Sequence, residues 1–296
     1  MMVAMKTRSF ISPTLLALIA IALWATLALL GLSLKHIPPF LLTGIALLMG
    51  SIPAWPFYKE WKVSFFVLAL GIYGLFGFHF LLFIALRHAP PVEANLVNYL
   101  WPLGIVVLSP LFLPNTRLTG THVLAACMGF SGAVMAILGE DLLKFGWHGI
   151  AAKGFAWGYL PAAGSAFIWA SYSLLSKRLA SQGRGFPTSA IGLFGLVSGV
   201  LSLLCHAVLE PHTSIPQSDW ALLAMMGLGP LGLAFYVWDA ALKRGDARQI
   251  GILSYITPLA STVLLLVFTG RHFDWHIAVA IVLILGAAIL GSIKKV

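Results

Sequence analysis

Polar side chains interrupt one of the long apolar stretches of this sequence, residues 89–110. Asn95, Asn98, Tyr99 and Pro102 are spaced i, i+3, i+4 and i+7, so a helix places them along one face. Lipid would penalise amide and hydroxyl groups inside a membrane, and this face is therefore expected to look into protein or a water-filled cavity. Hydrogen bonding to a small polar ligand is the chemistry that such a face offers.

The same pattern recurs 156 positions later in the chain. The residues that match Asn95, Asn98, Tyr99 and Pro102 are Gly251, Ser254, Tyr255 and Pro258. Further matches in the same order are Trp24 with Trp169, Pro39 with Pro187, Arg87 with Lys243, and Arg117 with Arg271. Chance similarity between apolar helices does not explain repeated Trp, Tyr, Pro and Arg. A duplicated, polar-faced membrane helix that contains a proline is typical of transporters built from two repeats.

Composition excludes a soluble domain. The 296 residues are 60% hydrophobic and only 9% charged, with a mean hydropathy of +0.96. The net charge of +9 comes from bases scattered between apolar runs, as in the loops of a membrane protein, so no nucleic-acid partner is expected. Cys127 and Cys205 both lie inside apolar runs, which favours neither a disulfide nor a metal site.

The apolar runs predict an all-α integral membrane protein with ten transmembrane helices. The expected spans are residues 11–34, 40–57, 63–86, 91–113, 119–138, 155–179, 187–209, 219–242, 247–269 and 274–293. Residues 1–138 would form one five-helix repeat, residues 139–154 a linker, and residues 155–296 a second repeat. Because five is odd, the second repeat must enter the membrane from the opposite side and is inverted. The first run is too long for a cleaved signal peptide.

Basic residues predict the orientation in the membrane. If both termini are cytoplasmic, 13 of the 18 Lys and Arg residues fall on the cytoplasmic side. This bias follows the positive-inside rule, so we expect a multi-pass protein of the cell inner membrane with both termini in the cytoplasm.

Three ionisable residues inside the predicted spans are possible proton carriers. His79 is too deep to reach the interface and lies at a depth similar to Tyr99, so it either faces a cavity or bonds within the bundle. Glu93 follows two prolines and suits the start of a helix. Asp239 precedes Lys243 by four residues, and an i,i+4 pair whose heads reach the interface explains it. We favour structural roles for Glu93 and Asp239.

Aromatic residues near the middle of spans complete the predicted site. Tryptophans of the membrane interface belong at helix ends, whereas Trp101, Trp169 and Trp238 do not lie there. Any one of them could simply pack between helices, but together with amides they suit an aromatic or apolar zwitterion. The predicted substrate-binding residues are His79, Asn95, Asn98, Tyr99, Trp101, Trp169, Ser254 and Tyr255.

Two prolines are candidates for gating. Pro102 and Pro258 each remove a backbone hydrogen bond, which predicts kinks near Leu100 and Ile256. Because the repeats are inverted, one kink would serve an outer gate and the other an inner gate.

Together these features resemble the drug/metabolite transporter superfamily in its EamA-repeat branch. The segment His79–Leu103, HFLLFIALRHAPPVEANLVNYLWPL, and the aromatic interior are most similar to the aromatic amino acid exporters of that branch. The resemblance covers the whole chain and implies export of amino acids, with Phe, Tyr and Trp first, by alternating access in a monomer without cofactor. The branch often carries acids after the fourth helix of each repeat, but residues 114–119 and 269–274 carry arginines there.

Other functions stay open at this point. Another efflux substrate of the same superfamily is one alternative. An intramembrane serine protease is another, because Gly129-Phe130-Ser131-Gly132 matches a G-x-S-G pattern, although small residues in a helix normally serve packing. A channel lacks a filter motif, and the absence of a nucleotide-binding glycine-rich loop argues against direct use of ATP. The sequence does not decide between proton coupling and facilitated transport.

Overall fold

A computed structural model describes residues 11–114, 116–151, 156–269 and 274–292, and these residues form helices without any strand. Nine stretches among them are long and apolar enough to cross a membrane. They are Pro13–Ser33, Pro39–Glu60, Phe65–His88, Pro91–Phe112, Gly120–Gly139, Ala190–Leu209, Gln217–Arg244, Ala247–Phe268 and Trp275–Ser292. The protein is therefore an all-α, multi-pass membrane protein, as predicted. The expected sixth span corresponds to α9 (Tyr159–Ser181), which is long enough but more polar than the other nine.

Most of the spans consist of more than one helix. The first half contains α1 (Pro13–Ala25), α2 (Leu27–Ser33), α3 (Pro39–Ser51), η1 (Ile52–Glu60), α4 (Phe65–Ile72), η2 (Tyr73–Gly77), α5 (Phe78–His88), α6 (Pro91–Asn98), α7 (Leu100–Phe112) and α8 (Gly120–Ala151). The second half contains α9 (Tyr159–Ser181), α10 (Ala190–Leu209), η3 (Gln217–Asp219), α11 (Trp220–Leu228), η4 (Gly229–Leu233), α12 (Ala234–Arg244), α13 (Ala247–Leu253), α14 (Ile256–Thr269) and α15 (Trp275–Ser292). Helix α8 continues into the predicted linker and has non-helical geometry at Gly146.

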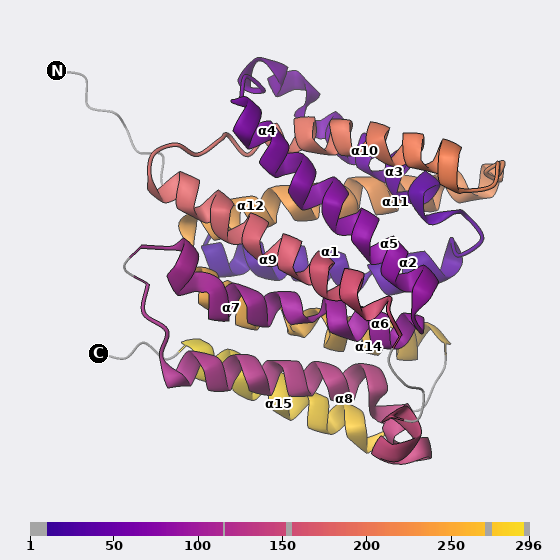
Figure 1. The fold of residues 1–296 in the computed structure, drawn as a ribbon, viewed down its shortest axis with the longest axis vertical. Helices are drawn as coiled ribbons and strands as arrows, with labels where there is room; N and C mark the ends of the chain where they lie inside the picture. The colour runs from indigo at the N-terminus through magenta and orange to yellow at the C-terminus, as the bar shows by residue number, and fades with distance from the viewer. Residues whose placement is uncertain (1–10, 115, 152–155, 270–273, 293–296) are drawn as a thin grey trace.

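The helices that pack most closely come from different halves of the chain. Helix α8 lies along α15, α3 along α10, α1 along α12, and α9 against both α5 and α7 (Figure 1). Small residues permit the crossing of α3 and α10, since a Cβ atom on Gly44 would lie 3.2 Å from the Gly199 carbonyl oxygen and one on Gly199 would lie 2.9 Å from that of Gly44. The halves therefore interdigitate rather than stand side by side.

Short π-helices occur at corresponding places in the two halves. The π-helix η2 begins at Tyr73 and the π-helix η4 begins at Gly229, which is 156 positions later. Helix breaks follow the same offset, since Tyr99 separates α6 from α7, and Ser254 and Tyr255 separate α13 from α14. The breaks lie next to the expected kink positions.

Both described ends of the chain lie at one end of the bundle (Figure 1). The Arg244 guanidinium donates to the Ile11 carbonyl over 2.5 Å, and the Gln249 amide donates to the Ser292 hydroxyl over 3.2 Å. These contacts bring the start of α1, the connection after α12, and the end of α15 together. We call this the terminal end of the bundle.

A buried carboxylate joins three helices at the opposite end. The Glu210 side chain is fully enclosed and accepts hydrogen bonds from the backbone N–H groups of Phe40 (3.0 Å) and Leu41 (3.2 Å) at the start of α3. It also pairs with Arg87 at the end of α5 (2.9 Å) and His206 of α10 (3.0 Å). We call this group the Glu210 cluster.

A second buried carboxylate lies at the terminal end. Asp239 of α12 pairs with Lys243 over 2.6 Å and accepts a hydrogen bond from the Thr188 hydroxyl over 2.7 Å. Lys243 also donates to the Phe186 carbonyl (2.7 Å), and Lys177 donates to the Lys243 carbonyl (3.1 Å). The i,i+4 pair forms as expected, but Asp239 is only 3% exposed and does not reach the interface. We call this group the Asp239 cluster.

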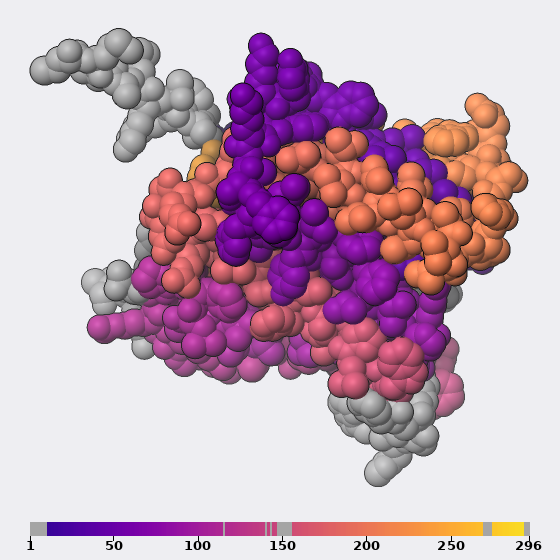
Figure 2. Space-filling model, turned by 45° about the horizontal axis from the view of Figure 1, so that its top comes forward, coloured from indigo at the N-terminus to yellow at the C-terminus, as the bar shows by residue number. Residues whose placement is uncertain are grey.

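Large apolar side chains cover the outside of the bundle. Phe65 is 85% exposed and Phe66 57% exposed at the start of α4, and Val282 of α15 is 71% exposed. This segment of α4 and the preceding η1 project from the body of the molecule (Figure 2). A membrane protein presents such side chains to lipid.

Candidate substrate site

A cavity of about 390 Å³ lies between the two halves of the chain. This volume lies within the range of about 300–1,000 Å³ that is usual for small-molecule pockets. Its wall comes from α1, α2, α3, α5, α6, α7, α9, α11, α12, α14 and the π-helix η4, together with Tyr99 at the junction of α6 and α7. Six predicted site residues line it: His79, Asn95, Asn98, Tyr99, Trp101 and Trp169.

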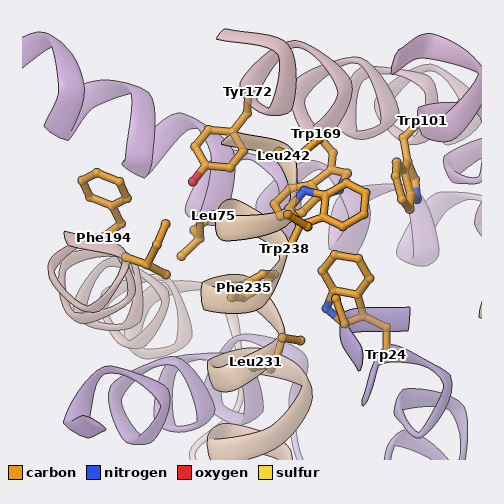
Figure 3. Close-up of a cluster of buried hydrophobic side chains, with 14 of the residues drawn as sticks. Trp24, Leu75, Trp101, Trp169, Tyr172, Phe194, Leu231, Phe235, Trp238 and Leu242 are labelled. Atoms are coloured by element: carbon orange, nitrogen blue, oxygen red, sulfur yellow. The ribbon is translucent and has the colours of Figure 1, made fainter. Parts of the chain in front are cut away.

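Four tryptophans from four helices form the inner wall of this cavity. Trp24, Trp101 and Trp169 line it directly, and Trp238 packs behind them with only 1% exposure (Figure 3). The Trp24 ring centroid lies 5.8 Å from that of Trp169 and 5.1 Å from that of Trp238. The Trp24–Trp169 pair is edge-to-face, an arrangement that is favourable for aromatic rings. An aromatic ligand would meet the same kind of surface.

Hydrogen bonds to the π-helices orient two of the wall residues. The Trp24 indole N–H donates to the carbonyl of Pro230 in η4 over 3.1 Å. His79 Nδ1 lies 2.6 Å from the carbonyl oxygen of Leu75 in η2. Because a carbonyl oxygen can only accept, Nδ1 of His79 carries the proton, and Nε2 of the neutral ring is left as an acceptor. The structure thus combines the two expectations for His79, a bond within the bundle and a place on a cavity.

Amide groups lie on the wall at α6. Asn98 is 5% exposed, and its Oδ1 accepts a hydrogen bond from the Ser165 hydroxyl of α9 over 2.8 Å. Asn95 lies one turn earlier on the same face and is exposed to the cavity that it lines. Tyr99 occupies the break between α6 and α7. The i, i+3, i+4 face read from the sequence therefore reaches the cavity.

Two predicted site residues do not line the cavity. Ser254 is fully buried and donates to the Ile250 carbonyl over 2.9 Å. Tyr255 is also fully buried, with its ring 6.4 Å from that of Phe130 and packed on Gly129. The reason is packing: α13 lies against α7, where a Cβ atom on Gly251 would be 3.2 Å from the Pro102 carbonyl oxygen, so this face meets protein instead of the cavity.

Several wall residues were not predicted from the sequence. Thr257 and Ser261 line the cavity from the first two turns of α14, and Thr43 of α3 and Phe235 of α12 lie on other walls. The spacing of Thr257 and Ser261, i and i+4, is the signal that could have identified them. Among the described residues of the wall none is Asp, Glu, Lys or Arg, so its polar groups are uncharged dipoles.

The other ionisable candidates lie outside this cavity. Glu93 is 9% exposed in the first turn of α6, the helix start expected from its sequence. Asp239 belongs to the buried cluster described above. Ser131 of the G-x-S-G pattern is exposed on the surface of α8, and neighbouring Gly129 leaves room for the Tyr255 ring. Packing accounts for this tetrapeptide.

A bundle of apolar helices around a cavity of this kind indicates a protein of the membrane transporter class. The sequence pattern of the EamA-like transporter family matches residues 11–138 and again residues 156–293. The chain is 42% identical over 289 residues to the aromatic amino acid exporter YddG of Ancylobacter novellus, covering 95% of this chain and 97% of that protein. It is 24% identical over 209 residues to the aromatic amino acid exporter YddG of Escherichia coli, covering 70% and 68% of the two chains.

A solved crystal structure has the same fold. It superposes with a TM-score of 0.84 at 40% sequence identity, covering 95% of this chain and 97% of that one. The chain described here belongs to the EamA-like transporter family. It is a transporter rather than an enzyme.

Proposed function

We propose that this protein exports aromatic amino acids, along with other neutral ones, by alternating access with the substrate held in the cavity. The observation that carries the proposal is the wall itself, in which tryptophans lie beside uncharged amides and hydroxyls. The tryptophan rings of the wall suit the aromatic side chain of the substrate. The uncharged amides and hydroxyls suit its α-ammonium and α-carboxylate groups, whose charges cancel. The YddG name of two relatives supports the same substrate class.

The proposal includes ten spans arranged as two inverted repeats. The two described ends of the chain lie at one end of the bundle, which requires an even number of crossings, and α9 with 23 residues is the natural tenth span. The repeats are supported by the 156-residue offset of η2 and η4, by packing between halves, and by the family pattern that matches twice. Because both halves of one chain build the cavity, a monomer suffices.

We further propose that the terminal end faces the cytoplasm across the inner membrane. Basic residues gather there: Lys177, Lys243, Arg244 and Arg248 all bond to backbone carbonyls or acids at this end. The cavity lies towards the other end, because its wall includes Gly31 near the end of span one and Thr43 near the start of span two. In this state the tryptophans separate the substrate from the cytoplasm.

The Glu210 and Asp239 clusters suggest how two gates could be stabilised. Each is built on a base near the end of the third span of its half, and these bases, Arg87 and Lys243, are 156 positions apart. The Arg87 guanidinium lies 5.6 Å from the Phe40 ring centroid, and the Lys243 ammonium 3.9 Å from that of Phe186. A rocking motion of one half against the other would loosen one cluster while the other stays intact.

Transport in reconstituted vesicles tests the proposal. The purified protein in proteoliposomes should accumulate labelled Phe, Tyr and Trp in exchange for internal amino acid, and should leave Lys and Glu outside. Uptake of charged amino acids in preference to aromatic ones would contradict it. An imposed pH gradient that changes the final accumulation would assign proton coupling, with His79, Glu93 and Asp239 as the carriers to vary first.

A further inference from the structure

One polar atom on the wall of the cavity is both buried and without a hydrogen-bond partner among the described residues. Thr257 is 4% exposed, and its Oγ1 is buried with no hydrogen-bond partner among the described residues. A buried hydroxyl without a partner destabilises a protein, and such groups in native structures call for an explanation. Thr257 lines the substrate cavity from α14, two residues beyond the helix break.

Two other hydroxyls of the same span behave differently. Thr262 donates to the Pro258 carbonyl over 2.9 Å and also approaches that of Ala136, so its hydrogen-bonding capacity is used. Ser254 donates to the carbonyl of Ile250 in the preceding turn. The usual solution for a hydroxyl in a helix, a bond to the carbonyl one turn earlier, is therefore available in this segment, yet Thr257 does not use it.

The remaining groups of the wall indicate what the Thr257 hydroxyl would bind. In the neutral His79 ring, Nε2 is an acceptor because Nδ1 donates to the Leu75 carbonyl, and an acceptor suits the α-ammonium group of an amino acid. The α-carboxylate on the same carbon then needs donors. The indole N–H of Trp24 is used by the Pro230 carbonyl, whereas the Thr257 proton has no acceptor among the described residues.

We propose that the Thr257 hydroxyl donates a hydrogen bond to the α-carboxylate of the bound amino acid. The inference rests on the proposed function and adds a residue of the second half that binds the end common to all amino acids. His79 belongs to the first half and Thr257 to the second, so a bound substrate would connect the halves across the cavity. Aromatic selectivity would then come from the tryptophans alone.

Three variants test this role in proteoliposomes. Thr257→Val removes the hydroxyl and keeps the shape, Thr257→Ser keeps the hydroxyl, and Thr262→Val is the matched control in the same helix. A hydrogen bond to a charged group corresponds to about a tenfold change in affinity or more. Thr257→Val should raise the KM for Phe and Trp by about tenfold, equally for both, whereas Thr257→Ser and Thr262→Val should stay within about threefold.

Inhibition by substrate analogues identifies the group that is bound. Phenethylamine lacks the carboxylate of Phe but keeps its ring and ammonium group. In Thr257→Val, the inhibition constant of Phe should rise about tenfold while that of phenethylamine stays unchanged. An equal rise for both compounds, or no change for either, would overturn the assignment, as would a change that depends on the size of the ring.

Stability measurements separate this role from a structural one. Because the Thr257 hydroxyl has no partner in the described part of the chain, Thr257→Val should leave the thermal unfolding temperature of the ligand-free protein unchanged or raise it. Poorer transport together with lower thermal stability would assign a structural role and overturn the inference. If the unmodified protein moves no amino acid, the proposed function itself fails, and this outcome is distinct from normal transport by Thr257→Val.

Discussion

The ring of Trp101 lies on the inner wall of the cavity, where a substrate ring would contact it. Stacking on an aromatic surface contributes about 0.5–1.5 kcal/mol beyond area burial, or about two- to tenfold in affinity. At matched membrane levels, Trp101→Ala should therefore weaken transport of Phe and Trp about two- to tenfold more than transport of Thr. Trp101→Phe should restore the preference, and Trp220→Ala, at an exposed position, serves as control. An equal loss for all substrates would assign Trp101 to packing only.

The Glu210 carboxylate has no exposed surface, and its charge is balanced by Arg87. Breaking a buried ion pair costs about 3–5 kcal/mol, and the partial exposure of Arg87 puts Arg87→Ala at the low end of that range. The unfolding temperature of this variant in detergent should fall clearly below that of the unmodified protein. Asp219→Asn breaks the more exposed His36–Asp219 pair and should cost less than about 1 kcal/mol. Equal effects of both variants would contradict this ranking.

How far single residues could be predicted depended on which helix each residue packs against. The face of Asn95, Asn98 and Tyr99 reaches the cavity at the end of α6. The equivalent face of the second half does not, because α13 packs on α7, where a Cβ atom on Gly251 would lie 3.2 Å from the Pro102 carbonyl oxygen. A periodic pattern along one helix does not reveal this partner. Burial of Asp239 was also missed, since the loop that covers it is distant in the sequence.

At the scale of elements, the break between α13 and α14 depends on Pro258. Proline has no N–H for the Ser254 carbonyl, which instead accepts from Thr257 over 3.0 Å in a tighter turn. Pro258→Ala would allow the regular bond and favour a straighter helix. We expect the transport rate to change several-fold while the amount of protein in the membrane stays constant.

The matched control for this prediction is Pro110→Ala. Pro110 lies inside α7 without interrupting it, so its replacement should leave the rate unchanged. Reduced membrane abundance of Pro258→Ala with a normal rate per molecule would make the break purely structural.

Element type and approximate bounds could be predicted from the sequence, because lipid enforces long apolar helices. Helix α9 is an exception, because it is less apolar than the other spans. Trp169, Tyr172 and Ser173 are buried among other helices, so α9 does not need an apolar surface against lipid. The π-helices could not be foreseen, since η2 and η4 depend on tertiary packing around glycines rather than on a periodic pattern.

At the scale of the whole molecule, the orientation can be tested by chemical labelling. Single cysteines introduced at Lys62 or Gln182, in a background without Cys127 and Cys205, should be shielded from an impermeant thiol reagent in intact cells. Cysteines at His36 or Thr213 should react, because the proposed topology puts them on the outer side. The reverse pattern would overturn the orientation, and labelling of Lys62 and Thr213 from the same side would overturn the span count.

The two π-helices also carry historical information. A π-turn holds one residue more than the α-turn that it replaces, and π-helices account for well under 1% of residues in proteins. Under the proposed duplication, η2 and η4 at the same offset are most simply explained by one inserted residue that was already present in a single ancestral half. That ancestor had only five spans and could build the cavity only by pairing with a second copy inserted upside down. The insertion would then predate the fusion, and an unfused ancestral protein would have needed to adopt both orientations in the same membrane.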